Sequence, residues 1–324
     1  MKKIFVIIYL LITFNVGISA ENYQITWVAE YSNNNLRAPN VSFGQKLVNF
    51  LFGGENIKIK RPFHLTMLDS EHLIFLDQGT GYLGKIDLKN NLLTWLTHKS
   101  KYRLYSAVSI CKLNNDSLLI TDGGLNKIFL YNIKKNKLKL WNDSLRINHP
   151  TGIAFYPSKN RIIVVETGKH RLLFLDKSGK IVRILGKRGV KPGEFNFPTF
   201  VWIDKNGTIY VNDSMNFRIQ IFEFDGALKN IFGKAGDVSG YFARPKGIAT
   251  DSNGNIYVVD ALSNVVQVFD QQGNLLAYFG GQGKNKSEFW MPIGIYIDSN
   301  DRIFIADSFN SRIQEFKLKK QRKP

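Results

Sequence analysis

The sequence contains one cysteine, Cys111, in 324 residues. A single thiol cannot form an internal disulfide, so a disulfide-stapled scaffold is excluded. The absence of a Cys-x-x-Cys-His segment also excludes covalently attached haem, and no other cofactor is indicated. Cys111 lies in the apolar stretch Ala107-Val-Ser-Ile-Cys, where a thiol packs as a small apolar side chain.

Long apolar runs are missing beyond the first twenty residues. Met1–Ala20 has two lysines, an apolar core and a small-residue end, which together predict a secretory signal peptide over residues 1–20. An uncleaved membrane anchor is the alternative, although the apolar core is shorter than the roughly 20 residues that span a bilayer. We therefore expect an extracytoplasmic protein, periplasmic or secreted, with cleavage near Ala20 and no later transmembrane span.

Acidic residues are in deficit. The chain has 44 Lys and Arg against 26 Asp and Glu, a formal net charge of +18. Such an excess favours acidic partners through long-range attraction that salt weakens, or it simply forms a solvated surface. Export argues against a nucleic acid, so the expected partner is a protein, with an acidic surface or a glycan left open.

An acidic residue closes a short apolar run six times, at intervals of 44 to 47 residues. A period of about 40–50 residues that holds several short strands indicates a repeat protein. In this position a carboxylate can bind the backbone of the next turn or pair with the arginine five residues later; the alternative is a cation held by the ring of acids. The six residues, for which we favour the structural function, are Asp77, Asp122, Glu166, Asp213, Asp260 and Asp307.

The repeats are clearest over residues 197–236, 244–283 and 291–317, where each predicts up to four strands with Asn-Gly or Asn-Asp turns. The last repeat has only three strands before a basic tail, residues 318–324. A ring must close or expose two sheet edges. We predict that Lys46–Phe52 supplies the missing strand, while Tyr23–Tyr31 also alternates like a strand without an assigned place.

Segments such as Pro245-Lys-Gly-Ile-Ala-Thr-Asp251 and Asp307-Ser-Phe-Asn-Ser-Arg312 resemble the NHL repeat. The resemblance implies an all-β fold, a six-bladed β-propeller of four-stranded antiparallel blades closed by an N-terminal strand. The expected order is a signal peptide (1–20), an N-terminal segment (21–44), the propeller (45–317) and the tail (318–324).

The resemblance raises one enzymatic alternative. Propellers of this type are similar to a lyase that holds zinc with histidines following the blade-opening prolines. Here those positions carry no histidine; His64 and His149 lie nearby but out of register. No metal site is therefore expected, although a metal-assisted lyase or a lactone hydrolase remains the alternative function.

Motifs such as Glu288-Phe-Trp-Met-Pro292 resemble an exported bacterial subfamily that accompanies multi-haem c-type cytochrome systems. The resemblance implies an accessory, non-catalytic binding or scaffolding protein. Its specificity is expected at residues that depart from the repeat consensus, with packing between blades as the alternative. The candidates are Phe200, Trp202, Met215, Phe217, Leu262, Phe289 and Trp290.

Overall fold

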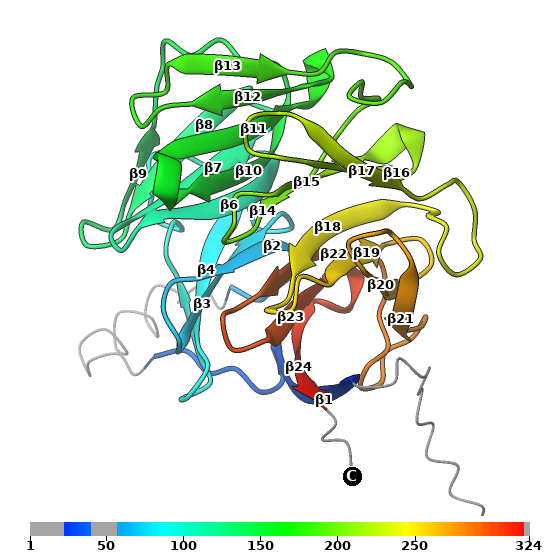
Figure 1. Cartoon of the computed structure of the whole chain (residues 1–324). Helices are drawn as coiled ribbons and strands as arrows, with labels where there is room; N and C mark the ends of the chain where they lie inside the picture. The colour runs from blue at the N-terminus through cyan, green and yellow to red at the C-terminus, as the bar shows by residue number, and fades with distance from the viewer. Residues whose placement is uncertain (1–22, 40–56, 321–324) are drawn as a thin grey trace, which may run out of the picture.

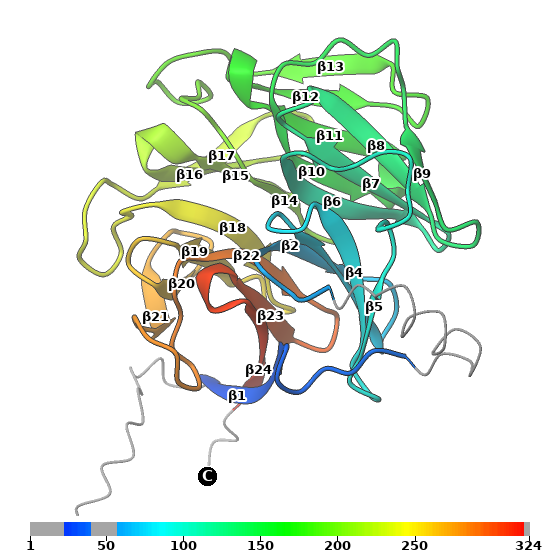
Figure 2. The same ribbon diagram turned by 180° about the vertical axis from the view of Figure 1, so that it is seen from behind.

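The computed structural model describes residues 23–39 and 57–320 of the chain. The strands of these residues form six antiparallel sheets of four strands each. Figure 1 shows the sheets arranged radially, and Figure 2 shows the same ring from behind. The prediction of an all-β, six-bladed propeller is confirmed. The signal peptide (1–20), most of the tail and the segment Lys46–Phe52 lie outside the described residues.

Each blade is a meander of four strands with its first strand innermost. Blade 1 comprises β2 (Pro62–Met67), β3 (His72–Asp77), β4 (Tyr82–Asp87) and β5 (Leu92–Trp95). Blade 2 comprises β6 (Ala107–Asn114), β7 (Ser117–Asp122), β8 (Lys127–Asn132) and β9 (Lys137–Leu140). Blade 3 comprises β10 (Pro150–Tyr156), β11 (Arg161–Glu166), β12 (Arg171–Leu175) and β13 (Ile181–Leu185).

The later blades repeat the pattern. Blade 4 comprises β14 (Val201–Ile203), β15 (Ile209–Asp213), β16 (Arg218–Phe222) and β17 (Leu228–Phe232). Blade 5 comprises β18 (Pro245–Thr250), β19 (Ile256–Asp260), β20 (Val265–Phe269) and β21 (Leu275–Gly280). Blade 6 comprises β22 (Pro292–Ile297), β23 (Arg302–Asp307), β24 (Arg312–Lys320) and β1 (Tyr23–Ser32). Short 3-10 turns are η1 (Pro157–Lys159), η2 (Thr167–Lys169), η3 (Ser214–Asn216) and η4 (Ser308–Asn310).

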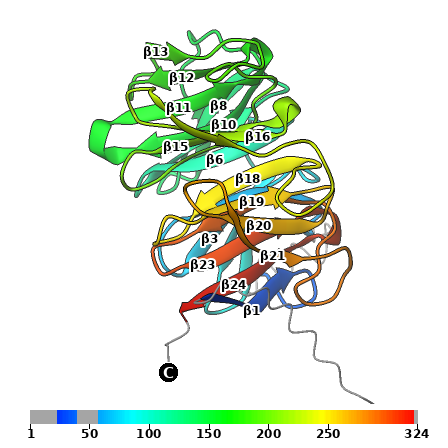
Figure 3. The ribbon, with the colours of Figure 1, turned by 45° about the vertical axis from the view of Figure 1, so that its right-hand side comes forward.

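The ring is closed by β1, which pairs with β24 from Tyr23 to Ser32. Figure 3 shows the two strands side by side at one end of the molecule. The prediction of an N-terminal closing strand is confirmed, but its assignment to Lys46–Phe52 was wrong, because Tyr23–Ser32 occupies that edge. The register of β1 shifts between Trp27 and Ala29, so that the strand contributes to two cores. Ile25 and Trp27 pack on the core between blades 5 and 6, and Ala29 and Tyr31 pack on the core between blades 6 and 1.

The cores lie between neighbouring blades, where β-branched and aromatic side chains of facing sheets interdigitate. The glycine-rich connections are blade-to-blade links. Gly186 and Gly233 have positive φ, and a Cβ on either would lie within 2.4 Å of the buried ring of Phe195 or Phe242. These glycines therefore let the chain turn tightly over an aromatic side chain.

Antiparallel strands alternate in direction, so the ends of successive strands meet at two opposite faces of the ring. One face carries the blade-to-blade connections and the turns between second and third strands; we call it the connector face. The other carries the hairpin turns between first and second and between third and fourth strands; we call it the hairpin face. The two faces differ sharply in composition, which is what positions the candidate site.

Candidate functional site

The six repeated acids brace the connector face. Each is fully or almost fully buried and accepts backbone N–H groups from the chain entering its own blade. Three of them also receive the Nε–H of the arginine five residues later: Glu166 from Arg171, Asp213 from Arg218 and Asp307 from Arg312, at 2.6 to 2.7 Å. The acids therefore hold the blade-opening chain and the following turn together.

Arg218 shows how far this bracing extends. It donates to the carbonyl oxygens of Val190, Lys191 and Glu194 at 2.7 to 2.9 Å, which fixes the connection between blades 3 and 4. Arg312 does the same for the connection between blades 5 and 6. The carboxylates of Asp213 and Asp307 thus fix the loops of the connector face without facing solvent.

The central channel is filled by side chains. Phe200 of blade 4 stacks on His64 and Phe63 of the opposite blade 1, with ring centroids 5.7 and 6.4 Å apart. Val108, Ala261 and Ile293 pack around it. Side chains from opposite blades can touch only near the ring axis, so this cluster, the central plug, occupies the channel.

His64 lies in the plug as a neutral ring. Its Nδ1 accepts the N–H of Ile110 at 3.3 Å, and burial lowers its pKa to about 4. No charged side chain contributes to that shift. In blades 3, 5 and 6 the equivalent residue is Gly152, Gly247 or Gly294, each pressed against the backbone of the next blade. His64 and Phe200 therefore replace glycines and fill the space in the channel.

The pKa of His64 gives a pH prediction. Between about pH 6.5 and pH 4 the unfolded chain binds a proton at this residue and the folded chain does not. The contribution of His64 to the free energy of unfolding should therefore be fully present above about pH 6.5. It should decline by roughly 3 kcal/mol as the pH falls to about 4. Thermal melting of H64F over this range should show a shallower pH dependence than the parent. Equal slopes in the two proteins would show that the plug tolerates an imidazolium.

The histidines are not gathered into a metal site. In residues 23–39 and 57–320 no three His, Cys, Asp or Glu side chains lie close enough together to hold an ion. The Nδ1 of His149 donates to the carbonyl oxygen of Gly123, and the Nδ1 of His170 accepts the N–H of Phe197. Burial raises the pKa of Cys111 to about 12, so its thiol stays protonated.

The seven candidate binding residues divide between interior and surface. Phe200 is in the plug, and Phe289 is fully buried against Phe279 and Phe316 between blades 5 and 6. Trp202 packs on Tyr296 and donates to Thr250 Oγ1, and Phe217 is half-buried beside the core between blades 4 and 5. These four are packing residues in this structure. The side chains of Met215, Leu262 and Trp290 are exposed on the connector face.

Two exposed residues of the same arc were not predicted. Phe309 stands two residues after its repeat acid, at the same repeat position as Met215 and Leu262, and packs against Trp290. Phe197 is exposed at the start of blade 4. Strict alignment of the repeats would have found Phe309. We call Phe197, Met215, Leu262, Trp290 and Phe309 the apolar arc; its members come from the consecutive blades 4, 5 and 6.

Exposed apolar side chains concentrate on this face. Of the fourteen large ones in the described residues, ten lie on connector-face loops and the other four on outer strands. None lies on a turn of the hairpin face in the described part of the chain. Exposed apolar residues on an ordinary surface are scattered singly, so their concentration distinguishes the connector face from the hairpin face.

Charge divides in the same way. The connector-face loops from residue 57 onward carry fifteen exposed Lys or Arg and, besides the buried repeat acids, four Asp or Glu. The hairpin-face turns carry seven Lys and eleven Asp or Glu. The fifteen are Lys58, Lys60, Arg61, Lys99, Lys101, Arg103, Arg146, Lys169, Lys187, Arg188, Lys191, Lys234, Arg244, Lys284 and Lys286. The basic excess, dispersed in sequence, is thus concentrated on one face by the fold.

Comparison with known proteins agrees with the fold. The sequence profile described as 6-bladed beta-propeller matches residues 141–232 and 242–322, more than half of the chain. This chain belongs to the 6-bladed beta-propeller family. A second profile, of the SMP-30/Gluconolactonase/LRE-like region, matches residues 196–280 of this 6-bladed beta-propeller.

The curated relatives support the NHL resemblance. NHL repeat-containing protein 2 of Bos taurus is 33% identical over 132 residues, and the match covers 32% of this chain. The match covers only 17% of the relative's own length. The activity and partners of that longer protein are therefore not carried over by the alignment.

Solved structures share the fold of this 6-bladed beta-propeller. A streptogramin B lyase has a TM-score of 0.59 at 14% identity, covering 92% of this chain and 98% of its own. An auxiliary nutrient binding protein from Bacteroides thetaiotaomicron has a TM-score of 0.65 at 14% identity, covering 92% and 76%. A gluconolactonase from Xanthomonas campestris has 0.61 at 15%, covering 80% and 86%. Enzymes and binding proteins thus share this architecture, and the site must decide the function.

Proposed function

We propose that this chain is an exported, non-catalytic binding propeller that docks an acidic protein partner on its connector face. The observation that carries the proposal is the coincidence of the apolar arc and the basic excess on one face. Interfaces combine an apolar, aromatic-rich centre with a polar rim, and the arc has this composition. The opposite face, with its acidic excess, would repel the same partner.

The centre of the docking surface is the pair Trp290 and Phe309, whose ring centroids are 5.9 Å apart. Lys284 Nζ lies 5.6 Å from the centroid of the Trp290 ring. A rigid aromatic pair beside a cation suits an acidic surface with an exposed apolar side chain, because the ring supplies contact area and the amine meets the carboxylates. Arg312 and Asp307 fix the loops that carry the pair, so these loops lose little conformational freedom on binding.

The cellular context belongs to the same proposal. The signal-like segment 1–20 supports export, and the resemblance of the connector-face motifs supports an accessory role in an extracytoplasmic, multi-haem cytochrome complex. A channel enzyme, such as a lyase or lactone hydrolase, would need room for substrate on the axis, where Phe200 and His64 lie. In the described residues no helix is long and apolar enough to cross a membrane.

The test compares matched charge reversals on the two faces. Protein purified from the host envelope, with an expected N-terminus near Glu21, is cross-linked to its partner, and the identified partner is then titrated with variants. R188E with K191E on the connector face should weaken binding at least tenfold, and binding of the parent should weaken steadily up to about 0.5 M salt. K134E with K135E changes the same charge on the hairpin face and should weaken binding less than twofold.

Three results would contradict the proposal. Equal losses from the two reversals would exclude the connector face as the docking surface. Salt-independent binding that W290A abolishes would leave the apolar arc as the site and remove the acidic partner from the proposal. Full-length protein beginning at Met1 in the cytoplasm would remove export.

A further inference from the structure

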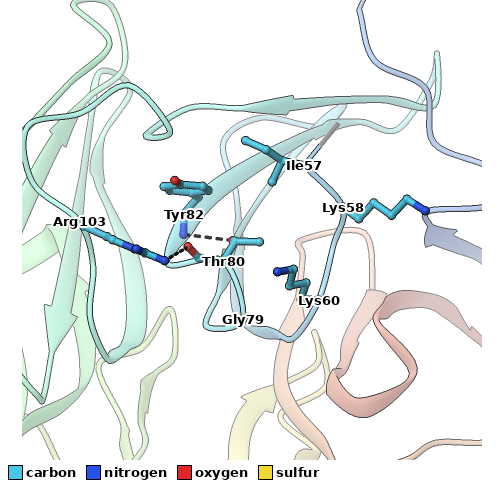
Figure 4. Close-up of a pocket in the computed structure, with 7 residues that line it drawn as sticks. All are labelled: Ile57, Lys58, Lys60, Gly79, Thr80, Tyr82 and Arg103. Atoms are coloured by element: carbon cyan, nitrogen blue, oxygen red, sulfur yellow. Dashed lines mark hydrogen bonds between the residues drawn. The ribbon is translucent and has the colours of Figure 1, made fainter. Parts of the chain in front are cut away.

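A pocket of about 430 Å³ opens on the connector face between blades 1 and 2, and none of its lining residues belongs to the apolar arc. Figure 4 shows the seven residues that line it. They are Ile57, Lys58, Lys60, Gly79, Thr80, Tyr82 and Arg103. A volume of this size lies in the range of small-molecule sites, which bind a ligand rather than a protein surface.

The pocket exists because blade 1 departs from the repeat at two positions. In blade 6, the residue 17 before the repeat acid and the residue two after it are Trp290 and Phe309, which pack together. In blade 1 the same positions hold Lys60 and Gly79. A Cβ on Gly79 would lie 2.5 Å from the Cβ of Lys60, so these two positions are in contact here as well. Replacing an aromatic pair by lysine and glycine leaves the space open.

At a third position, blade 1 lacks the arginine that pairs with the repeat acid in other blades. Tyr82 stands five residues after Asp77, where blades 3, 4 and 6 have the arginine that pairs with the repeat acid. The Tyr82 ring is held by an edge contact with Trp95, at 6.3 Å between centroids. The pocket therefore has a positioned aromatic wall, made of Tyr82 with Ile57, where other blades have a buried ion pair.

The charge of the pocket has one sign. Three of the seven lining residues are cations and none is acidic. Figure 4 shows the Lys60 amine pointing toward Thr80, and Arg103 reaching the same turn from the other side, while Lys58 points away. Arg103 meets Thr80 O only at 3.5 Å, and within the described residues no carboxylate pairs with Lys60 or Arg103. Two cations that converge without a counter-charge favour an anion between them.

We propose that this pocket binds the anionic group, a carboxylate, sulfate or phosphate, of a small ligand. Lys60 of blade 1 supplies a point charge. Arg103, in the connection to blade 2, supplies a planar guanidinium group that can donate two hydrogen bonds to one anion. Tyr82 and Ile57 contact the uncharged part of the ligand. The site is separate from the apolar arc, so the proposal does not depend on the docking of a protein partner.

The test uses the full mature chain in isothermal titration at low salt. The probes are inorganic phosphate, sulfate, glucuronate and, as the uncharged match of glucuronate, glucose. The three anions should bind and glucose should not. Tighter binding of glucuronate than of the inorganic ions would assign the site to an organic acid, and the reverse order would assign it to a free oxyanion. Absence of binding for all three anions would overturn the proposal.

Variants then locate the site. K60Q and R103Q should each weaken anion binding about tenfold, the usual effect of removing one charge-assisted contact. K101Q, an exposed lysine two residues before Arg103, should change it less than twofold. Equal effects of all three would indicate adventitious attraction to the basic face and overturn the proposal.

A filled pocket gives the decisive comparison. K60W places at position 60 the aromatic side chain that blade 6 has as Trp290, and it leaves Gly79 unchanged, where any Cβ would lie 2.5 Å from the Cβ of residue 60. The variant should melt like the parent, keep partner binding and lose anion binding more completely than K60Q does. Anion binding that survives in a folded, filled variant would place the site elsewhere and contradict the inference.

Discussion

A chain that begins at Gly44 is expected to lose the closed ring and to unfold well below the chain that begins at Glu21. The shorter chain lacks β1, which completes blade 6 by pairing with β24. Tyr31 is 4% exposed and sits in the core shared by blades 6 and 1, and its hydroxyl donates to Glu315 at 2.7 Å. Its removal exposes that core and a long unpaired strand edge, which favours aggregation.

The expected loss is large. Burying Tyr31 contributes roughly 1.5–3 kcal/mol, and the partly buried Ile25 and Trp27 add smaller amounts, together a substantial fraction of the stability of a domain. We expect the melting temperature to fall by at least about 10 °C, or cooperative melting to disappear. The segment after β1 adds to the closure, because Arg37 bridges to Leu92 at the outer edge of blade 1.

The comparison also separates the two segments proposed for closure. The chain that begins at Gly44 retains Lys46–Phe52, so unchanged melting would show that this segment, and not β1, completes the ring. The point variant Y31F is the matched mild change. It removes only the hydrogen bond to Glu315 and should cost about 1–3 kcal/mol without aggregation.

D213N is expected to destabilise the protein more than D122N, although both carboxylates are fully buried. Asp213 accepts from Arg218 Nε at 2.7 Å and from the side chains of Asn216 and Gln220. Neutralising it leaves the largely buried Arg218 without its counter-charge, which typically costs about 3–5 kcal/mol. Asp122 accepts only backbone N–H groups, from Tyr105, Ser106 and Leu125, so its loss should cost about 1–3 kcal/mol.

The measurement is denaturant unfolding of both variants, with amide hydrogen exchange as a local readout. In D213N, exchange should accelerate at residues 190–194, the connection that Arg218 holds, and it should not change there in D122N. Equal destabilisation by the two substitutions would show that the ion pair adds nothing to the backbone contacts. R218M provides the reciprocal test, because it leaves the charge of Asp213 buried without its arginine.

Several elements of the fold could be predicted from local sequence. The regular spacing of the repeat acids from Asp77 to Asp307 indicates a repeat, because a blade of four meandering strands needs a nearly constant chain length. The positions of the acids and of Arg218 and Arg312 follow from contacts within one blade. Because those partners lie close in sequence, spacing alone was enough to pair them.

The closing strand could not be predicted in the same way. The two paired strands, Tyr23–Ser32 and Arg312–Lys320, are almost 300 residues apart in the sequence. Neither segment contains a local pattern that identifies the other as its pairing partner. Lys46–Phe52 matched the repeat pattern better than Tyr23–Ser32 did. Pairing was decided by which segment could place Trp27 and Tyr31 into the cores at the ends of the ring. That decision requires the assembled sheet edge.

The sequence by itself determined the blades, the repeat acids and the total charge, because each depends on residue type and local spacing. Only the tertiary structure decided where these features lie. Phe200 and Phe289 are aromatic residues of the kind found in binding sites. Ring closure, however, places Phe200 on the axis and Phe289 between blades 5 and 6. Lys60 and Arg103 lie 43 residues apart and converge on one pocket. Curvature of the ring brings successive connections to a common face, so the dispersed charge becomes one basic surface.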